Sequence, residues 1–266
     1  MRTKLATLIL AAAVVTLATS AYADDWDKDY KVSGTPEVRI ETNDAEIHVK
    51  SADASDVKVH VVAEGLQIGP GKVRISERQD GSRIEVEVHR PNEIHFFNFN
   101  MHRSIRIEVT VPRQANLNLH TGDGNVEVDT VKGQLRVDTS DGHIEGDGLD
   151  GDLQARSGDG HIRLRGRFDR VQLHSGDGNV EVEAGAGSRM ASPWSVSSGD
   201  GSVRVSVPEN FAADLDAHTG DGHITVNFPL TMSGSFNEST VRGKINGGGQ
   251  SLEIRSGDGN ITLDRM

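Results

Sequence analysis

One short motif recurs along the chain, and its spacing constrains the fold more than any other feature. The motif reads Ser/Thr, Gly/Ser, Asp, Gly, a polar residue and then Ile or Val. Its copies begin at Thr121, Thr139, Ser157, Ser175, Ser198, Thr219 and Ser256. The second glycines of the first four copies stand at 124, 142, 160 and 178, which is a constant step of 18 residues. A fixed period of this kind predicts a stack of repeating units.

Apolar and polar residues alternate on both sides of each motif, as in Leu135-Arg136-Val137 before the second copy. Alternation with period two is typical of half-buried strands. One coil cannot bury its own apolar face, but stacked coils bury a continuous column and pair their strands about 4.8 Å apart. The sequence therefore predicts an all-β, single-stranded β-solenoid, β-helix-like, with coils of about 18 residues and two short strands per coil.

The solenoid repeats are expected over residues 113–266, and residues 35–112 are expected to form a capping region continuous with them. Alternating segments such as 57–61 and 105–111 are joined by wider turns there. A solenoid exposes its core at each end, so we expect an N-terminal antiparallel β cap. The gap between the second glycines at 222 and 259 is about two periods, which predicts one degenerate coil over residues 227–250.

The first residues have the pattern of a signal peptide, which we assign to residues 1–23. A basic start at Arg2 and Lys4 precedes an apolar run, and Ala21-Tyr22-Ala23 is typical of a cleavage site. The run is too short for a membrane span, and no other stretch approaches one. We therefore expect export to the periplasm or the cell surface, with residues 24–34 as a flexible acidic lead-in.

Composition excludes several classes of function. The chain contains no cysteine, so it has no disulfide, no thiolate metal site and no thiol nucleophile. Its formal net charge is −12, which argues against nucleic acid or anionic lipid as a partner, because both need a basic surface. A cation, a basic protein or a neutral glycan remains compatible with this charge.

The motif residues have a structural interpretation. The glycines are expected to adopt positive φ at a tight turn, the Asp carboxylate to accept hydrogen bonds from its own turn, and the hydroxyl group to reach the next coil. We expect these tasks to account for the motif, with the nearby histidines as solvated turn residues.

A second interpretation is metal binding. Coils in register would align carboxylates about 4.8 Å apart, where two of them repel by about 0.9 kcal/mol in water. A cation would relieve that repulsion, as in the calcium β-roll built from Gly-Gly-x-Gly-x-Asp repeats. The candidate ligands are Asp123, Asp141, Asp159, Asp177, His143 and His161. Apart from calcium, no cofactor and no catalytic residue is indicated.

Three phenylalanines, Phe96, Phe97 and Phe99, gather in one expected loop. They are candidates for contact with a partner, or for a plug that closes the end of the apolar column.

The repeated turns, the Val-Pro sequences before Leu117 and Leu215, and the ending Asn246-Gly247-Gly248-Gly249 resemble the bacterial putative-adhesin family over residues 34–264. The resemblance implies a β-solenoid exported to the cell envelope. It implies no catalytic residues, since that family, a β-strand-repeat domain of unknown function, has no established active site.

Repeats and export together favour a non-catalytic envelope or surface protein, an adhesin or scaffold that binds an envelope protein or glycan through its repetitive face. The sequence also leaves self-association of solenoids open as a further interaction. The alternatives are the calcium-binding protein and, less favoured, a polysaccharide-acting β-helix enzyme, which would need long loops around a groove.

Overall fold

The computed structural model describes residues 23–90, 103–232 and 237–266. Residues 1–22 of the predicted signal peptide (1–23) and the candidate contact residues Phe96, Phe97 and Phe99 lie outside this described part. Within it the chain forms strands and no helix, and all the strands belong to one sheet. The strands are β1 (Ala23–Lys31), β2 (Glu37–Thr42), β3 (Glu46–Ala52), β4 (Asp56–Glu64), β5 (Arg74–Asp80), β6 (Arg83–His89), β7 (Ser104–Pro112), β8 (Asn116–Thr121), β9 (Val126–Asp129), β10 (Lys132–Thr139), β11 (Ile144–Ser157), β12 (Ile162–Ser175), β13 (Val180–Ala184), β14 (Trp194–Ser198), β15 (Val203–Val207), β16 (Ala213–Thr219), β17 (Ile224–Val226), β18 (Leu230–Met232), β19 (Thr240–Ile245), β20 (Ser251–Ser256) and β21 (Ile261–Arg265).

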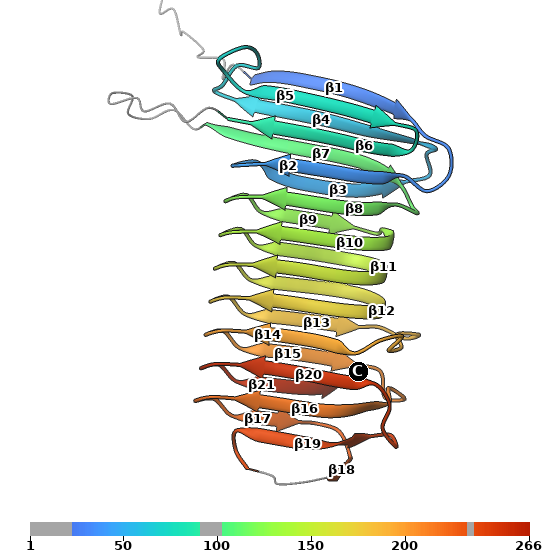
Figure 1. Cartoon of the computed structure of the whole chain (residues 1–266), viewed down its shortest axis with the longest axis vertical. Helices are drawn as coiled ribbons and strands as arrows, with labels where there is room; N and C mark the ends of the chain where they lie inside the picture. Colours follow the sequence, from blue (N-terminus) through green and yellow to red (C-terminus); the bar gives the residue numbers. More distant parts are fainter. Residues whose placement is uncertain (1–22, 91–102, 233–236) are drawn as a thin grey trace, which may run out of the picture.

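The sheet is wound into a tall stack with two faces (Figure 1). The first face consists of a row of neighbouring strands. In stacking order they are β5, β6, β2, β8, β10, the second halves of β11 and β12, β14, β20, β16, β19 and β18. The second face is the row β1-β4-β7-β3-β9, the first halves of β11 and β12, then β13-β15-β21-β17. In the middle of the stack all pairings are parallel and in register. Leu135, for example, lies between Leu117 and Leu153.

The corner opposite the motif is less sharply turned than the sequence predicts. β11 and β12 each run without a break from one face to the other. Their pairing continues around the corner with register shifts between Gly146 and Leu149 and between Gly151 and Asp152. In these coils the two expected short strands are therefore one bent strand.

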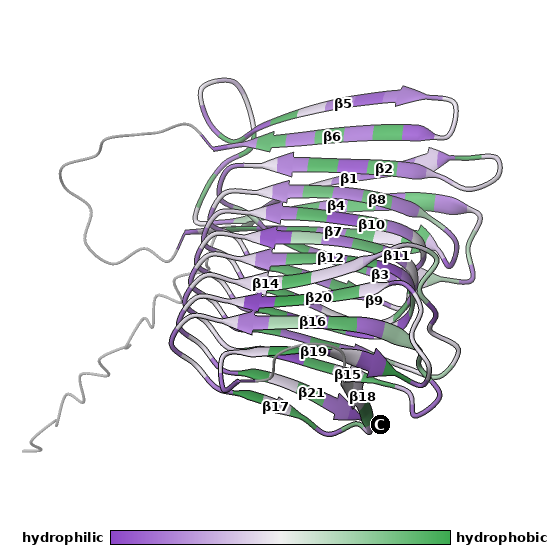
Figure 2. Ribbon diagram, turned by 60° about the horizontal axis from the view of Figure 1, so that its bottom comes forward, coloured by the Kyte–Doolittle hydropathy of each residue, from purple (hydrophilic) through white to green (hydrophobic). Residues whose placement is uncertain are grey.

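The core is a single apolar column between the two faces. Apolar and polar residues alternate along the strands, as the colours of Figure 2 show. The largest fully buried side chains include Tyr30, Phe168 and Trp194. Trp194 packs against Phe211 with ring centroids 5.1 Å apart. In the described part, Met266 is the one large hydrophobic side chain that is exposed.

Antiparallel pairs occur at the N-terminal end, where β4 lies between β1 and β7, and β5 pairs with β6. The prediction of a flexible lead-in over residues 24–34 is wrong for most of its length, because residues up to Lys31 form β1. Two aromatic side chains, Trp26 and Tyr30, pack against the core. The Tyr30 hydroxyl group donates a hydrogen bond to Glu77 Oε2 at 2.6 Å, which ties β1 to β5.

Chain order and stacking order differ at both ends of the stack. β2 and β3 lie between the β6–β7 pair and β8–β9. β20 and β21 lie between β14–β15 and β16–β17, and their red ribbons in Figure 1 are flanked by orange on both sides. The predicted degenerate coil over residues 227–250 is also wrong. That segment supplies β18 and β19 instead: β19 pairs with β16 and β18 pairs with β19, both antiparallel, so these strands extend the first face and form no coil.

Candidate functional site: the motif edge

The seven motif copies and a degenerate copy at Thr42 form one straight edge of the stack, which we call the motif edge. Neighbouring copies are in direct contact through their second glycines. The contacts run in the order Ala45, Gly124, Gly142, Gly160, Gly178, Gly201, Gly259 and Gly222. The copy that contains Gly259 therefore precedes the one that contains Gly222, in agreement with the interleaved strands. The sequence spacing gave no sign of this exchange.

Each motif hydroxyl group is buried and joins two coils. Ser175 Oγ accepts a hydrogen bond from the N–H of Gly178 in its own turn at 3.0 Å. The same oxygen donates to the carbonyl oxygen of Gly160, one coil away, at 2.8 Å. The predicted reach of the hydroxyl to the next coil is thus confirmed. The members of this hydroxyl ladder are Thr121, Thr139, Ser157, Ser175, Ser198, Thr219 and Ser256.

The motif glycines are required for a reason other than the predicted one. None of the second glycines has positive φ. Instead, a Cβ atom on Gly160 would stand 1.9 Å from the carbonyl oxygen of Gly142, and a Cβ on Gly178 would stand 2.1 Å from that of Gly160. Successive turns therefore stack too closely for any side chain at this position.

The motif Asp side chains are all exposed. Within the described part, no hydrogen bond or ion pair involves the carboxylates of the seven copies, so the predicted capping of their own turn is wrong. The turn N–H group is already taken by the Ser or Thr hydroxyl, and the Asp N–H bonds to the neighbouring coil, as Asp177 N does to Gly158 O at 3.0 Å. The candidate ligands Asp123, Asp141, Asp159 and Asp177 thus stand in one exposed column, the Asp column. Asp200, Asp258 and Asp221 continue it.

The polar residue after each second glycine forms another ladder. His143 Nδ1 accepts a hydrogen bond from the N–H of His161 at 3.0 Å, and His161 Nδ1 accepts one from the N–H of Asn179 at 2.9 Å. The two imidazole rings are stacked, with centroids 5.1 Å apart and planes 3° from parallel. Asn125, Asn179, Ser202 and Asn260 use side-chain oxygens for the same purpose.

This ladder bears on the candidate metal ligands His143 and His161. A neutral imidazole that accepts a hydrogen bond at Nδ1 carries its proton on Nε2. A metal ion at either ring would therefore have to displace a backbone hydrogen bond or a proton. Metal binding at the motif edge remains a prediction.

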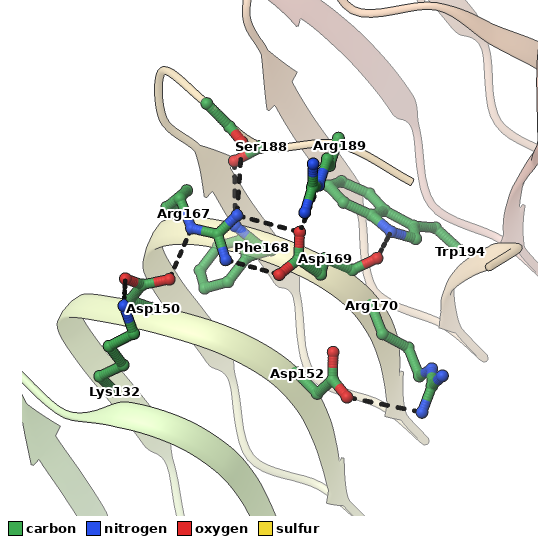
Figure 3. Close-up of polar contacts among 11 residues, drawn as sticks. Lys132, Asp150, Asp152, Arg167, Phe168, Asp169, Arg170, Ser188, Arg189 and Trp194 are labelled. Atoms are coloured by element: carbon green, nitrogen blue, oxygen red, sulfur yellow. Dashed lines mark hydrogen bonds and ion pairs between the residues drawn. The ribbon is translucent and has the colours of Figure 1, made fainter. Parts of the chain in front are cut away.

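The opposite corner of the stack carries a polar network that the sequence did not indicate (Figure 3). Arg167 donates hydrogen bonds to both oxygens of Asp169, at 2.9 and 2.5 Å, and to Asp150 at 2.5 Å. Its hydrogen bonds lower the pKa of the Asp169 carboxyl group, and Arg189 adds to this effect. The indole N–H of Trp194 donates to the carbonyl oxygen of Asp169 at 3.2 Å. Since every acid in this network has a basic partner, its role is structural.

A third set of polar groups lies at the N-terminal end. Asp25 and Asp27 of β1 and His60 of β4 are the one group of three metal-ligating side chains that lie close together in the described residues. His60 Nδ1 is 2.7 Å from Asp27 Oδ1. All three are at least partly exposed. The sequence does not indicate this group, because Asp25 and Asp27 meet His60 only through the pairing of β1 with β4.

The repeat geometry agrees with a comparison against family models. A model described as Toastrack DUF4097 matches residues 36–191 and, in a second overlapping match, residues 115–264. The chain belongs to the Toastrack DUF4097 family. The predicted resemblance to a domain family of unknown function is thereby confirmed.

Solved structures with similarity to this Toastrack chain have low sequence identity. One is described as a putative cell adhesion protein from Clostridium sporogenes, with 14% identity, a TM-score of 0.45, and coverage of 92% of this chain and 100% of the other. A putative lipid binding protein from Parabacteroides distasonis has 13% identity, a TM-score of 0.46, and coverage of 91% and 98%. A putative adhesin from Bacteroides fragilis has 10% identity, a TM-score of 0.31, and coverage of 91% and 97%.

A comparison with curated proteins finds no match. In the part of the Toastrack chain that the structure describes, no helix has the length and hydropathy needed to cross a membrane.

Proposed function

We propose that the protein is a non-catalytic envelope or surface protein that binds an extended basic partner, a protein or a cationic glycan, along its motif edge. The observation that supports this proposal is the Asp column, which presents one exposed carboxylate per coil. Other acidic side chains of the stack, such as Glu181 and Asp169, already have basic partners. The formal net charge of −12 adds a long-range attraction for a cationic partner.

The column is a rigid multivalent surface. Its backbone is held by the hydroxyl ladder, the polar ladder and the strand hydrogen bonds, so the carboxylates keep the coil spacing of about 4.8 Å. A single exposed ion pair contributes only about 0–1 kcal/mol. Useful affinity therefore requires a partner whose cationic groups repeat along the column, because linked contacts add avidity.

The finer architecture belongs to the same proposal. We infer a repeating coil of about 18 residues in the regular middle of the stack. The antiparallel strands β1, β4 and β5 would then act as a cap that covers the apolar column at the N-terminal end. Deleting β1 removes the buried Tyr30 and leaves β4 as an exposed edge, so it should lower the midpoint of thermal unfolding. An unchanged midpoint would contradict the capping role.

Export is part of the proposal and rests on the sequence pattern of residues 1–23. Cell fractionation and N-terminal sequencing of the mature protein test it. A cytoplasmic protein that retains Met1 would contradict both the export and the envelope role.

The binding proposal is tested with two cationic probes, poly-L-lysine and chitosan, in surface plasmon resonance at low salt. A variant with Asp123, Asp141, Asp159 and Asp177 all changed to Asn keeps the backbone hydrogen bonds and should lose at least tenfold in affinity. A control in which four acids outside the column, Glu145, Asp147, Glu209 and Asp214, are changed to the amides has the same net charge as the four-Asn variant and should lose much less affinity than that variant does. An equal loss of affinity in both variants would show that only the net charge matters, and it would overturn the proposal.

Calcium binding by the Asp column is the second candidate, favoured by the absence of described partners for those carboxylates. A thermal unfolding curve with calcium chloride and with a chelator separates it from partner binding. An increase in midpoint with calcium that the four-Asn variant lacks would support it, and an unchanged midpoint would remove it.

A further inference from the structure

The last coil of the chain, β20–β21, occupies a position that two other coils enclose. On the first face, Ile254 lies between Val196 of β14 and Ala217 of β16. On the second face, Ile261 lies between Val203 of β15 and Ile224 of β17. The inserted coil therefore makes parallel ladders on both sides, unlike a terminal coil added to the end of a solenoid.

The enclosed position is formed entirely by residues outside the inserted coil, and we call it the slot. The slot supplies partners for polar groups of both strands of the coil. Ser256 Oγ donates to Gly201 O at 2.9 Å, and Thr219 Oγ1 donates to Gly259 O at 2.8 Å. Arg204 pairs with Asp264 at 2.7 Å.

The connection into the slot is short and rich in glycine. Residues 246–250 carry the chain from β19, outside β16, to β20 on the other side of β16. Asn246, Gly247 and Gly248 all have positive φ, at 47°, 89° and 89°. Glycine permits other conformations of such a connection. Adopting them would release the hydrogen bonds that the Asn246 amide donates to the carbonyl oxygens of Glu209 and Phe211.

Chain order makes the slot available before its occupant. β14 to β19 precede β20–β21 in the sequence, so during synthesis or refolding the slot can exist with two unpaired sheet edges. Unpaired edges are templates for strand pairing with another chain. A second copy of the same chain offers the strand pair that fits.

We propose that two copies of this protein exchange their last coils, so that residues 251–266 of each copy fill the slot of the other. Every contact of the coil is reproduced in the exchanged dimer, and only the conformation of residues 246–250 changes. Exchange of identical elements is a low-cost route to a dimer for this reason. The inference does not depend on the proposed ligand of the motif edge.

The absence of cysteine from the native chain makes a direct test available. Ser195 and Glu253 are outward-facing partners in register on β14 and β20. Directly paired residues on adjacent strands are within the Cα separation that a disulfide bridges. A single chain that carries both Ser195→Cys and Glu253→Cys should form an intramolecular disulfide. This variant is the positive control, because it shows that the two positions can be bridged.

For the test, a Ser195→Cys chain and a Glu253→Cys chain are unfolded in urea, mixed at high concentration, refolded and oxidised. Exchange predicts a covalent dimer on a non-reducing gel. The control replaces Glu253→Cys by Gln154→Cys, which faces outward on the same side but pairs with residue 172 and not with 195. No more covalent dimer than in the control would overturn the proposal.

Shortening the connection provides a second measurement. Without Gly247, Gly248 and Gly249, the connection from β19 is too short for β20 to reach the slot of its own chain. The exchanged dimer should then be the main species, as measured by light scattering. The native protein should show the dimer only as a fraction that grows with the protein concentration during refolding. A shortened chain that stays a folded monomer would contradict the exchange.

Discussion

The hydroxyl group of Ser256 donates a hydrogen bond to the carbonyl oxygen of Gly201, 2.9 Å away, across a sequence separation of 55 residues. Ser175 makes the same bond to Gly160 across 15 residues, at 2.8 Å. The contact is therefore the same whether the neighbouring coil is adjacent in the sequence or distant. Position in the stack, and not order in the chain, determines which two motif copies bond.

Removing one hydroxyl group should destabilise the stack. Ser175→Ala leaves the buried N–H of Gly178 and the carbonyl oxygen of Gly160 without this partner, at a cost of about 1–3 kcal/mol in the free energy of unfolding. Ser175→Thr is the matched control, because Thr occupies this place at Thr139 and Thr219. Urea unfolding measures both variants. Equal stability of the Ala and Thr variants would show that the ladder contributes nothing.

A side chain at a second motif glycine should be tolerated worse than one at a first glycine. Gly160→Ala places a methyl group 1.9 Å from a backbone carbonyl oxygen, so neighbouring coils must separate, at a cost of about 1–3 kcal/mol. Gly158→Ser is the milder comparison, because a Cβ there would stand 2.5 Å from the carbonyl oxygen of Ser140 and not 1.9 Å, and Ser140 itself carries a side chain at that place in the adjacent coil. The two midpoints of thermal unfolding give the comparison. A less stable Ser variant would contradict the stacking argument.

The polar ladder can be tested by exchanging its two kinds of acceptor. His143→Asn preserves an acceptor for the N–H of His161, as Asn125 and Asn179 do for their neighbours. His143→Ala removes it together with the ring stacking, and should lower the free energy of unfolding by about 0.5–1.5 kcal/mol. Chemical denaturation with amide hydrogen exchange at His161 reports both the global and the local effect. Faster exchange in the Asn variant as well would argue against the acceptor role.

The Arg167–Asp169 pair should make stability depend on pH at the acidic end. The pKa of Asp169 is lowered in the folded protein by its hydrogen bonds with Arg167. This stabilisation is complete above the unfolded-state pKa of about 3.9 and disappears as the pH falls through the folded-state value. Asp169→Asn should therefore be less stable than the native protein at pH 7, with a difference that narrows below about pH 4. A constant difference between pH 7 and pH 3 would contradict this assignment.

The sequence was sufficient for the parts of the structure that repeat locally. Period-two alternation identifies the buried residues, because successive strand residues point to opposite sides. The motif also identifies the buried hydroxyl groups. The sequence could not reveal why the motif glycines are needed. A positive φ favours glycine, and so does a neighbouring coil so close that a Cβ atom would stand 1.9 Å from its carbonyl oxygen.

The parts that the sequence missed depend on long-range pairing. Four Asp residues between Ala23 and Lys31 hide the strand character of β1, which exists because β4 offers it an edge. The position of β20–β21 has no local signal either, because their motif copy fits equally well beside any other copy. For the candidate site, the sequence located the Asp column, while the role of His143 and His161 as hydrogen-bond acceptors required the geometry.

The interleaved ends also constrain how chains of this kind can change in length over evolution. A coil added after β21 would start inside the stack and could not pair with β20–β21, because β16–β17 already occupies the neighbouring position. A unit duplicated between β10 and β13 instead meets the same neighbours above and below that its parent had. We therefore expect relatives of different height to have gained or lost coils in the regular centre, while both interleaved ends stay as they are.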